Sequence, residues 1–354
     1  MKTFCTVLLA AASLYAADLT ISLTAPPDTG QLRILLFDSP DTFGDLRDPV
    51  FSKTVPTAGQ AKITLSDVPE GRYALVVHHD ENSDEKINKN FIGIPREPVG
   101  FANGYKPKGP PSFSRALLNI DAENNRPVPT ELHRPLGERG RIGAGVGVIF
   151  SSSPYRGSDS VTVIPIPAIT YTGKRLQIFG PQARYTLVDR NQAQLALAAN
   201  YRPPAYEEDD SPALTGLGDR DSTLLAGPEL NLELPKGMDL SLGYRHDILD
   251  QIGGGEASVS VDKSYNAGTM RLTPSFGLRW TSEQLTRHDY GIPGYRPGSM
   301  LSTEAALSAS IEMTESWWLA GRIGVERLGD EATDSPITDR DFVIKGYLAI
   351  SYLF

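Results

Sequence analysis

The sequence predicts an all-β protein in which a small N-terminal β-sandwich precedes an antiparallel transmembrane β-barrel of about 10–12 strands. Three observations carry this prediction. The 354 residues include 33 Gly and 27 Pro, which suit many short strands better than long helices. Beyond the N-terminal segment no run reaches about 18 apolar residues, so no transmembrane helix is expected. The second half consists of long segments in which apolar and polar residues alternate.

Residues 1–17 predict a secretory signal peptide. Lys2 supplies a positive charge, Phe4–Ala12 is largely apolar, and the small residues Ala16–Ala17 follow. The alternative is an N-terminal strand or helix of a protein core. The single cysteine, Cys5, lies in this segment, so a processed chain would have no disulfide and no cysteine-based site.

Residues 18–132 predict a periplasmic β-sandwich domain. Its candidate strands are short and are separated by Pro, Gly and Asp turns. They lie at Leu19–Leu23, Leu32–Phe37, Ala61–Leu65, Tyr73–His78 and Ala116–Ile120. The periodicity is lost after Asp121, and residues 133–141 are predicted to be a linker.

Residues 142–354 predict a β-barrel in the outer membrane of a Gram-negative bacterium. Segments 222–234, 237–248, 269–280 and 302–313 each have one apolar and one polar face. In the last of these, the two faces are Ala305, Leu307, Ala309, Ile311 and Met313 against Ser302, Glu304, Ser308, Ser310 and Glu312. A soluble sandwich would show the same alternation with its apolar residues inward.

Segment length and aromatic residues favour the membrane. The segments run to roughly 10–14 residues, whereas an ordinary strand has about 5 or 6 and a tilted span needs about 9–11. Apolar faces end in aromatics that fit interfacial girdles: Tyr201, Tyr244, Trp280, Trp317 and Tyr352. The terminal strand carries Tyr352 and Phe354, a pattern that looks like the insertion signal read by the barrel-assembly machinery.

The connections alternate between tight turns and long loops. Tight turns are expected at Asp189–Asn191, Pro235–Lys236, Tyr265–Asn266 and Thr314–Glu315, and long loops at Pro203–Arg220, Glu283–Met300 and Gly329–Arg340. Periplasmic turns are short and external loops are long, which places the N-terminal domain in the periplasm. This alternation gives about ten strands from Val161 onward, and Arg141–Phe150 adds to that number.

The polar faces predict a charged lumen with both signs. Its residues are Glu229, Glu233, Asp239, Arg245, Asp247, Arg271, Arg279, Glu304, Glu312, Arg322 and Glu326. Buried charges require partners or water. We therefore expect a paired plug with at most a thin channel.

One loop has the spacing of a calcium site. Oxygen ligands recur at alternate positions, as in the start of a calcium-binding loop. They are Asp80, Asn82, Asp84, Lys86 through its carbonyl, and Asn88. Glu85 stands where the sharp turn requires Gly, and Phe91 stands where a bidentate Glu is expected. The alternative is an Asx-rich hairpin tip whose side chains bond their own backbone.

Other chemistry has little support. The net charge of −9 excludes a nucleic-acid-binding surface. The adjacent His78 and His79 fit one core and one surface residue better than a metal site. His288-Asp289 and Ser211 lie in loops that meet at one rim, but no Gly-x-Ser-x-Gly motif accompanies them, so no catalytic residue is assigned.

The barrel half resembles the MipA/OmpV family of outer-membrane proteins. The resemblance rests on the order of Ser153–Ser158, Pro165–Pro167, Leu214–Asp219, Asp289–Ile292, Arg327–Asp330, Asp334–Ile337 and Tyr352–Phe354. It implies an outer-membrane barrel. Members of the family are described as scaffolds that bring a murein-cleaving transglycosylase to a peptidoglycan synthase, and others as porin-like or adhesive.

The N-terminal half resembles an uncharacterised periplasmic domain family of unknown function. The signature residues are His79–Asp84, Gly93–Asn103 and Pro110–Phe113. The resemblance implies no activity.

The function expected from the sequence is a non-enzymatic scaffold. Its periplasmic domain would recruit a cell-wall or envelope partner such as a peptidoglycan-synthesising or peptidoglycan-cleaving enzyme. A narrow porin-like channel and an outer-membrane hydrolase are the alternatives. No cofactor is expected apart from the calcium ion considered above.

Overall fold

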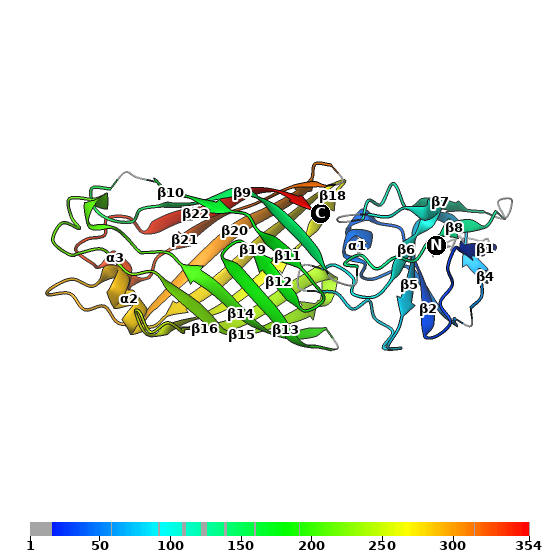
Figure 1. The fold of residues 1–354 in the computed structure, drawn as a ribbon, viewed down its shortest axis with the longest axis horizontal. Helices are drawn as coiled ribbons and strands as arrows, with labels where there is room; N and C mark the ends of the chain where they lie inside the picture. The colour runs from blue at the N-terminus through cyan, green and yellow to red at the C-terminus, as the bar shows by residue number, and fades with distance from the viewer. Residues whose placement is uncertain are drawn as a thin grey trace, which may run out of the picture.

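The computed structural model describes residues 16–57, 59–90, 93–107, 111–121, 126–137, 140–158, 161–190, 192–314 and 316–353. Most of the predicted signal peptide and Phe354 lie outside these residues. Two all-β parts lie end to end, with the N-terminal domain on the right of Figure 1 and the barrel on the left. None of the helices in the described part of the chain has the length and apolar character needed to cross a membrane.

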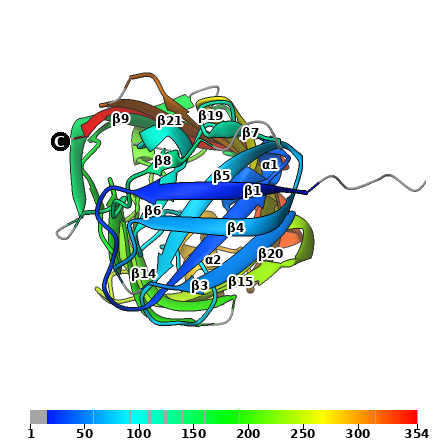
Figure 2. The same ribbon diagram turned by 90° about the vertical axis from the view of Figure 1, so that its right-hand side faces the viewer.

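The N-terminal domain is a sandwich of two sheets. The smaller sheet has the order β4-β1-β8, and the larger has the order β3-β2-β5-β6 with β7 also paired to β5. Figure 2 shows β1 and β4 in front of the larger sheet. The strands are β1 (Ala16–Leu23), β2 (Gln31–Phe37), β3 (Phe51–Pro56), β4 (Lys62–Pro69), β5 (Gly71–Asp80), β6 (Val99–Phe101), β7 (Leu117–Ile120) and β8 (Val128–Thr130).

The larger sheet is buried on both faces. One face packs against the smaller sheet through residues such as Ile21, Ile34 and Leu75. The other face is covered by helix α1 (Pro40–Asp45) and by the chain around Tyr105 and Phe113. Phe43 of α1 makes an edge-to-face contact with Phe101 at a centroid distance of 5.9 Å. Burial on both faces explains why β5 reads as an unbroken apolar run instead of an alternating strand.

The predicted linker is partly ordered on the domain. His133 and Val99 exchange two backbone hydrogen bonds of 3.0 Å, and Leu136 is buried. Strand β9 then begins at Arg141. Pro135 in this stretch obscures a strand period without preventing individual backbone hydrogen bonds.

The second half closes into an antiparallel barrel of twelve strands, since β9 pairs with β22. Of its 14 segments, β10 with β11 and β17 with β18 each form one strand. The segments are β9 (Arg141–Ser152), β10 (Val161–Pro167), β11 (Thr170–Thr172), β12 (Leu176–Phe179), β13 (Gln182–Arg190), β14 (Ala193–Arg202), β15 (Thr223–Leu234), β16 (Met238–Asp247), β17 (Gly255–Lys263), β18 (Tyr265–Ala267), β19 (Met270–Thr281), β20 (Met300–Glu312), β21 (Trp317–Arg327) and β22 (Phe342–Leu353).

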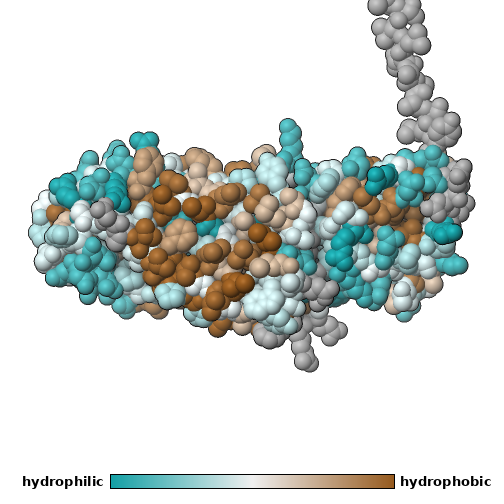
Figure 3. Space-filling model, turned by 90° about the horizontal axis from the view of Figure 1, so that it is seen from above, coloured by the Kyte–Doolittle hydropathy of each residue, from teal (hydrophilic) through white to brown (hydrophobic). Residues whose placement is uncertain are grey.

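The outer face of the barrel carries the apolar half of each alternation. Val146, Phe276 and Leu307 are among its exposed side chains. Figure 3 shows a hydrophobic band over the barrel, bordered by hydrophilic residues at the end away from the N-terminal domain. The predicted girdle residues Tyr201, Tyr244, Trp280, Trp317 and Tyr352 also point outward. An apolar belt of this kind is the surface that a bilayer requires.

The two ends of the barrel differ as predicted. The turn end, next to the N-terminal domain, carries the short connections. The loop end carries the long ones and includes helices α2 (Glu283–Tyr290) and α3 (Asp330–Thr333). The predicted turn at Tyr265–Asn266 is instead strand β18, and the chain turns at Gly268, whose φ of 63° suits glycine.

The domain sits directly on the turn end. Helix α1 approaches β18 so closely that a Cβ at Gly44 would lie 2.2 Å from Nδ2 of Asn266. Gly44 has no positive φ, so its requirement for glycine comes from this close approach and not from backbone conformation.

Gly44→Leu should therefore weaken the docking of the domain by about 1–3 kcal/mol, because the side chain cannot fit against Asn266. Hydrogen exchange measured by mass spectrometry should become faster in residues 40–46 and 264–268. Gly298→Leu is the matched control, since no atom lies within 4 Å of a Cβ there. Unchanged exchange at both faces in Gly44→Leu would contradict the close contact.

Candidate functional site

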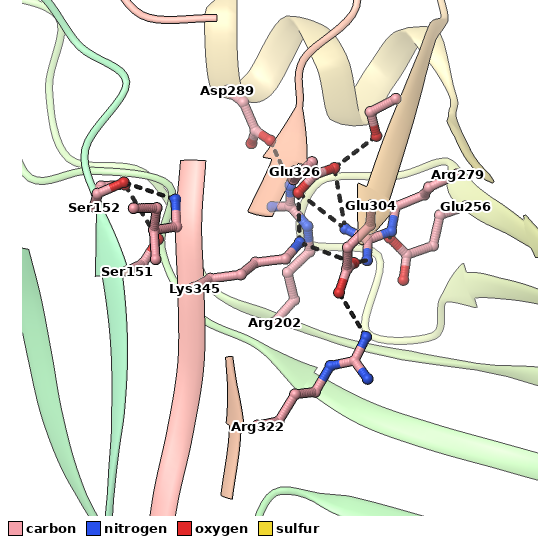
Figure 4. Close-up of polar contacts among 12 residues, drawn as sticks. Ser151, Ser152, Arg202, Glu256, Arg279, Asp289, Glu304, Arg322, Glu326 and Lys345 are labelled. Atoms are coloured by element: carbon pink, nitrogen blue, oxygen red, sulfur yellow. Dashed lines mark hydrogen bonds and ion pairs between the residues drawn. The ribbon is translucent and has the colours of Figure 1, made fainter. Parts of the chain in front are cut away.

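Figure 4 shows the largest group of charged side chains inside the barrel, on strands β19 to β22. Glu304 and Glu326 are directly opposite each other on β20 and β21, where like charges repel. Arg279 on β19 offsets this repulsion because it reaches both carboxylates. Its Nη2 lies 2.9 Å from Glu304 Oε2 and its Nη1 3.4 Å from Glu326 Oε1. Glu256 of β17 approaches the same guanidinium at 4.0 Å.

Two further cations complete this cluster. Arg322 Nη2 lies 2.6 Å from Glu304 Oε1, and Lys345 Nζ lies 2.5 Å from Glu326 Oε2. The hydroxyl of Ser302 donates to Glu326 Oε1 at 2.6 Å. The cluster thus contains three cations and three carboxylates, the condition under which buried charges are tolerated.

A second network crosses the neighbouring strands. Glu229 on β15 is almost fully buried, with 4% of its surface exposed. Arg245 on β16 donates to its Oε2 at 2.6 Å, and Arg184 on β13 pairs with its other oxygen. In both networks a side chain bonds to more than one partner, so the networks link neighbouring strands from inside the barrel.

The structure divides the predicted lumen residues among three places. Glu229, Arg245, Arg279, Glu304, Arg322 and Glu326 lie in the two networks, and Glu233, Asp239 and Arg271 lie at the turn end. Glu312 ends β20. Asp247 caps the loop after β16, accepting hydrogen bonds from the backbone N–H groups of Ile252 and Gly253.

The sequence analysis missed three lumen cations: Arg184, Arg202 and Lys345. Each stands at a polar position of an alternating strand, so strict counting along those strands would have found them. It would not have found their partners, which lie on other strands.

The N-terminal domain closes the turn end with charged residues. Arg47 Nη2 lies 3.0 Å from Asp239 Oδ1 and 3.6 Å from Glu233 Oε1. In the opposite sense, Arg271 of the barrel lies 3.0 Å from Asp45 of the domain.

Two more contacts cross this interface. Arg96 of the domain lies 3.0 Å from Asp189 of the barrel. Gln194 of the barrel donates to the carbonyl oxygen of Lys89 at 2.9 Å. Both the domain and the barrel contribute hydrogen-bond acceptors and cations to this interface. The domain can therefore satisfy these groups in one position on the barrel only.

Lys89 is the most deeply buried cation of the domain at this interface. Burial, together with the neighbouring Arg47 and Arg271, lowers the pKa of Lys89 to about 8, although Glu233 and Asp45 partly offset this effect. Its Nζ donates to the backbone oxygen of Asp45 at 2.5 Å. The interface therefore holds an amine that binds its proton less tightly than usual, within an otherwise paired set of charges.

The loops cover the other end. A hydrophobic cluster joins the long loops across the mouth, and its members are Tyr155, Tyr206, Leu214, Tyr290, Met300, Leu328, Ala332, Ile337 and Val343. The Tyr155 hydroxyl donates to the carbonyl oxygen of Asp289 at 3.2 Å, and its ring packs edge-to-face on Tyr206. The loop end is thus a packed lid rather than an open rim.

Asp289 anchors this lid to the barrel wall. Its Oδ2 accepts from Arg202 at 2.5 Å, and His288 Nδ1 lies 3.1 Å from its Oδ1. Burial alone would raise the pKa of Asp289, but Arg202 and His288 outweigh it and hold the pKa below the usual value. Ser211 donates instead to the carbonyl oxygen of Arg156. The predicted rim residues are therefore not brought together as a nucleophile and its base.

The Asp80 loop uses its oxygens on its own backbone. Asp80 accepts from the N–H groups of Asp84 at 3.2 Å and Glu85 at 2.8 Å, and Asn82 also accepts from Asp84. Asn88 donates to the Asp84 carboxylate at 3.0 Å. Within the described residues, no three or more His, Cys, Asp or Glu side chains are grouped to hold a metal ion. This geometry is that of an Asx-rich hairpin tip, and calcium binding by Asp80, Asn82, Asp84, Lys86 and Asn88 stays a prediction.

Glu97, from the second signature segment, locks this loop in place. Its carboxylate accepts from His78 at 2.9 Å, from the N–H of Glu81 at 3.0 Å and from Asn88 at 3.3 Å. Burial would raise the pKa of Glu97, but these donors lower it below its usual value. His79 is also buried, against Thr29, so the prediction that one of the two histidines lies on the surface was wrong. The signature residues therefore have a structural role.

Fold and lumen together define an outer-membrane β-barrel with a second domain docked on its turn end. The chain belongs to the family described as "MltA-interacting protein MipA", which matches residues 144–354. Residues 24–127 match a second family, "Uncharacterized protein conserved in bacteria (DUF2141)". Both resemblances inferred from the sequence are thereby confirmed, as is the outer-membrane location.

The relatives are outer-membrane proteins. The chain is 30% identical to the MltA-interacting protein of Escherichia coli over 60% of its own length and 89% of that protein. It is 27% identical to the putative outer membrane protein YiaT of the same organism, over 60% and 91%. A solved Pseudomonas aeruginosa FadL homologue overlaps 60% of this chain and 89% of that one, with 8% identity and a TM-score of 0.29, which is too low to support an argument.

Arg279→Ala should lower the stability of the barrel by about 3–5 kcal/mol, since it leaves buried carboxylates with too few cations. The temperature at which the folded band shifts on a gel should fall accordingly. Arg287→Ala is the control, because it breaks only an exposed pair with Glu283. Equal shifts in both variants would refute a bracing role for Arg279.

Stability should also rise with pH through Lys89. The native state binds this proton more weakly than the unfolded chain, so the cost of the charged amine is complete below pH 8 and disappears toward pH 10.5. Between pH 7 and pH 9 the free energy of unfolding should increase by about 1 kcal/mol relative to Lys89→Met. Melting temperatures of both proteins at both pH values test this, and parallel pH profiles would contradict it.

Proposed function

We propose that the protein is a non-enzymatic scaffold of the outer membrane, whose N-terminal domain holds a cell-wall enzyme at the membrane's periplasmic face. The observation that carries this proposal is the docked domain. Ion pairs at Arg47, Arg96 and Arg271 fix it on the turn end of the barrel. In outer-membrane barrels short turns face the periplasm, so a partner bound to this domain would be held at a fixed height above the membrane.

The filled lumen favours the scaffold function and argues against the channel function. The domain covers one mouth, the packed loops cover the other, and two networks of paired charges lie between them. An open pore needs a continuous aqueous path, whereas the polar groups of this lumen pair with one another. A narrow porin-like channel remains the competing function to be tested.

The domain offers a groove to a partner on the side away from the barrel. It has a volume of about 380 Å³ and lies where the two sheets of the sandwich open between β1, β7 and β8. Half-buried Leu117 and Leu118 line it, with Asn103, Asn119 and Arg126 around them. Apolar floors with polar rims are typical of sites that bind a segment of another protein.

The family supports one class of partner. The Escherichia coli relative is named for its interaction with MltA. The family resemblance implies a murein-cleaving transglycosylase for such members, so we propose an enzyme of this class as the partner of the groove.

A photo-crosslinking residue at Asn119 should capture a peptidoglycan-cleaving enzyme in intact cells. The control carries the same residue at Lys53, which is exposed on β3 and does not line the groove. Mass spectrometry identifies the adducts. An adduct with this class of enzyme at Asn119 but not at Lys53 supports the scaffold, and its absence refutes the proposed partner.

Planar-bilayer recordings separate the scaffold from the channel. The purified full chain should give no reproducible open conductance, because both mouths and the lumen are occupied. A stable conductance that disappears on boiling would overturn the scaffold proposal in favour of the channel.

A further inference from the structure

Strand β10 has a neighbour on one side only. It pairs with β9 along Val161–Pro167, and among the described residues no strand pairs with its other edge. The next hairpin is too short to reach it, because β12 has only four residues. A barrel normally has no free edge, so this is a local interruption of the wall.

Hydrogen bonds locate the limits of the interruption. The tip of the short hairpin ends against Ile169, where Gly180 N–H donates at 2.9 Å. On the other side, Tyr201 N–H donates to Pro181 at 3.0 Å, one residue before β14 ends. Toward the loop end, Ser211 donates to the carbonyl oxygen of Arg156, which joins the flanking loops above the free edge. Hydrogen-bonded chain segments therefore border the interruption on each of these sides.

The prolines of β10 stand at the free edge. Ala168 N–H donates to Gly145 of β9, and in an antiparallel ladder the residues that face one neighbour alternate with those that face the other. Val161, Val163, Pro165 and Pro167 must then direct their backbone groups away from β9. Two of these four positions have no N–H, so the edge is poorly suited to receive a strand from another protein.

Both faces of β10 are apolar and accessible. Val163 points outward and is 56% exposed. Ile164 points into the lumen, because it lies in one cross-strand row with Ile149, Tyr347 and the lumen residue Arg322. It is nevertheless 37% exposed, whereas the lumen residue Ala196 on β14 is 1% exposed. The lumen beside β10 is therefore locally open and lined by isoleucine.

We propose that the free edge of β10 is a lateral binding site for an acyl chain of a membrane lipid. The edge lies in a wall whose outer face is the apolar belt, so hydrocarbon is the medium next to it. An acyl chain matches the apolar side chains on both faces and needs no hydrogen-bond donor. The carbonyl oxygens left at the edge meet water from the lumen, which limits their cost. This inference does not depend on the proposed scaffold function.

Site-specific fluorescence tests the proposal on the full chain. Single thiols are introduced at Ile164, Val163 and Ala306 in a Cys5→Ser background and labelled with bimane. Val163 is the lipid-facing reference, and Ala306 is a lumen-facing reference on β20, in one row with the lumen residue Ser275. The proteins are placed in phosphatidylcholine vesicles that contain phospholipid with a nitroxide on its acyl chain.

The label at Ile164 should be quenched to within about twofold of the label at Val163, because direct acyl-chain contact determines the quenching. The label at Ala306 should be quenched several-fold less. Quenching at Ile164 as weak as at Ala306, or quenching there by aqueous iodide alone, would overturn the proposal. The gel heat shift confirms folding, and Ile166→Cys, on the same lumen row of β10, replaces Ile164 if that variant does not fold.

Discussion

Charge pairing inside the lumen is the condition on which the rest of this structure depends. Side chains fill the interior of a barrel of about eight strands, but twelve strands enclose more space. Every second side chain of each strand points into that space. This chain fills it with charges, and the direct opposition of Glu304 and Glu326 is tolerable only because Arg279 lies between them. The cations hold together strands that the backbone ladder alone would leave around a water-filled core.

The same electrostatics attach the second domain. Arg47 of the domain forms an ion pair with the barrel carboxylate Asp239, and Asp45 of the domain forms an ion pair with the barrel cation Arg271. The domain is thus bound by groups that continue the lumen's own charge pairing, and not by an apolar patch. Such an interface is specific in register, because each of these charges meets its opposite only when the domain lies in this position. A scaffold requires this property, since it must hold its cargo at a defined place.

Much of this fold is visible in the sequence, because strand alternation is a local property. The long apolar faces, the short turns and the aromatic ends follow from residues a few positions apart. The four residues of β12 are too few to show a period, so local reading gives only a range of about 10–12 strands, which includes the twelve of the structure. The partner of each lumen charge is non-local, and Lys345 illustrates this. Its polar position could be read from β22, but its pairing with Glu326 of β21 depends on register.

The Asp80 loop shows a different limit. Asp and Asn at alternate positions suit a calcium ion and an Asx-rich turn equally well, since both need oxygens directed inward. What distinguishes them is the direction of nearby N–H groups, and here Asp84 and Glu85 present theirs to Asp80. Glu97 adds a constraint from a distant segment. The spacing of ligands is thus insufficient evidence when the backbone can use the same oxygens.

The prolines of β10 show the opposite case, in which a local sequence feature indicates a feature of the whole barrel. Pro165 and Pro167 argue against a central strand, because proline has no N–H to donate to a neighbouring strand. A closed barrel has only central strands, so either the segment lies outside the barrel or the barrel has an edge. The pairing of β10 with β9 alone decides for the edge. With both mouths covered, this edge is where the lumen meets its surroundings, and those surroundings are lipid.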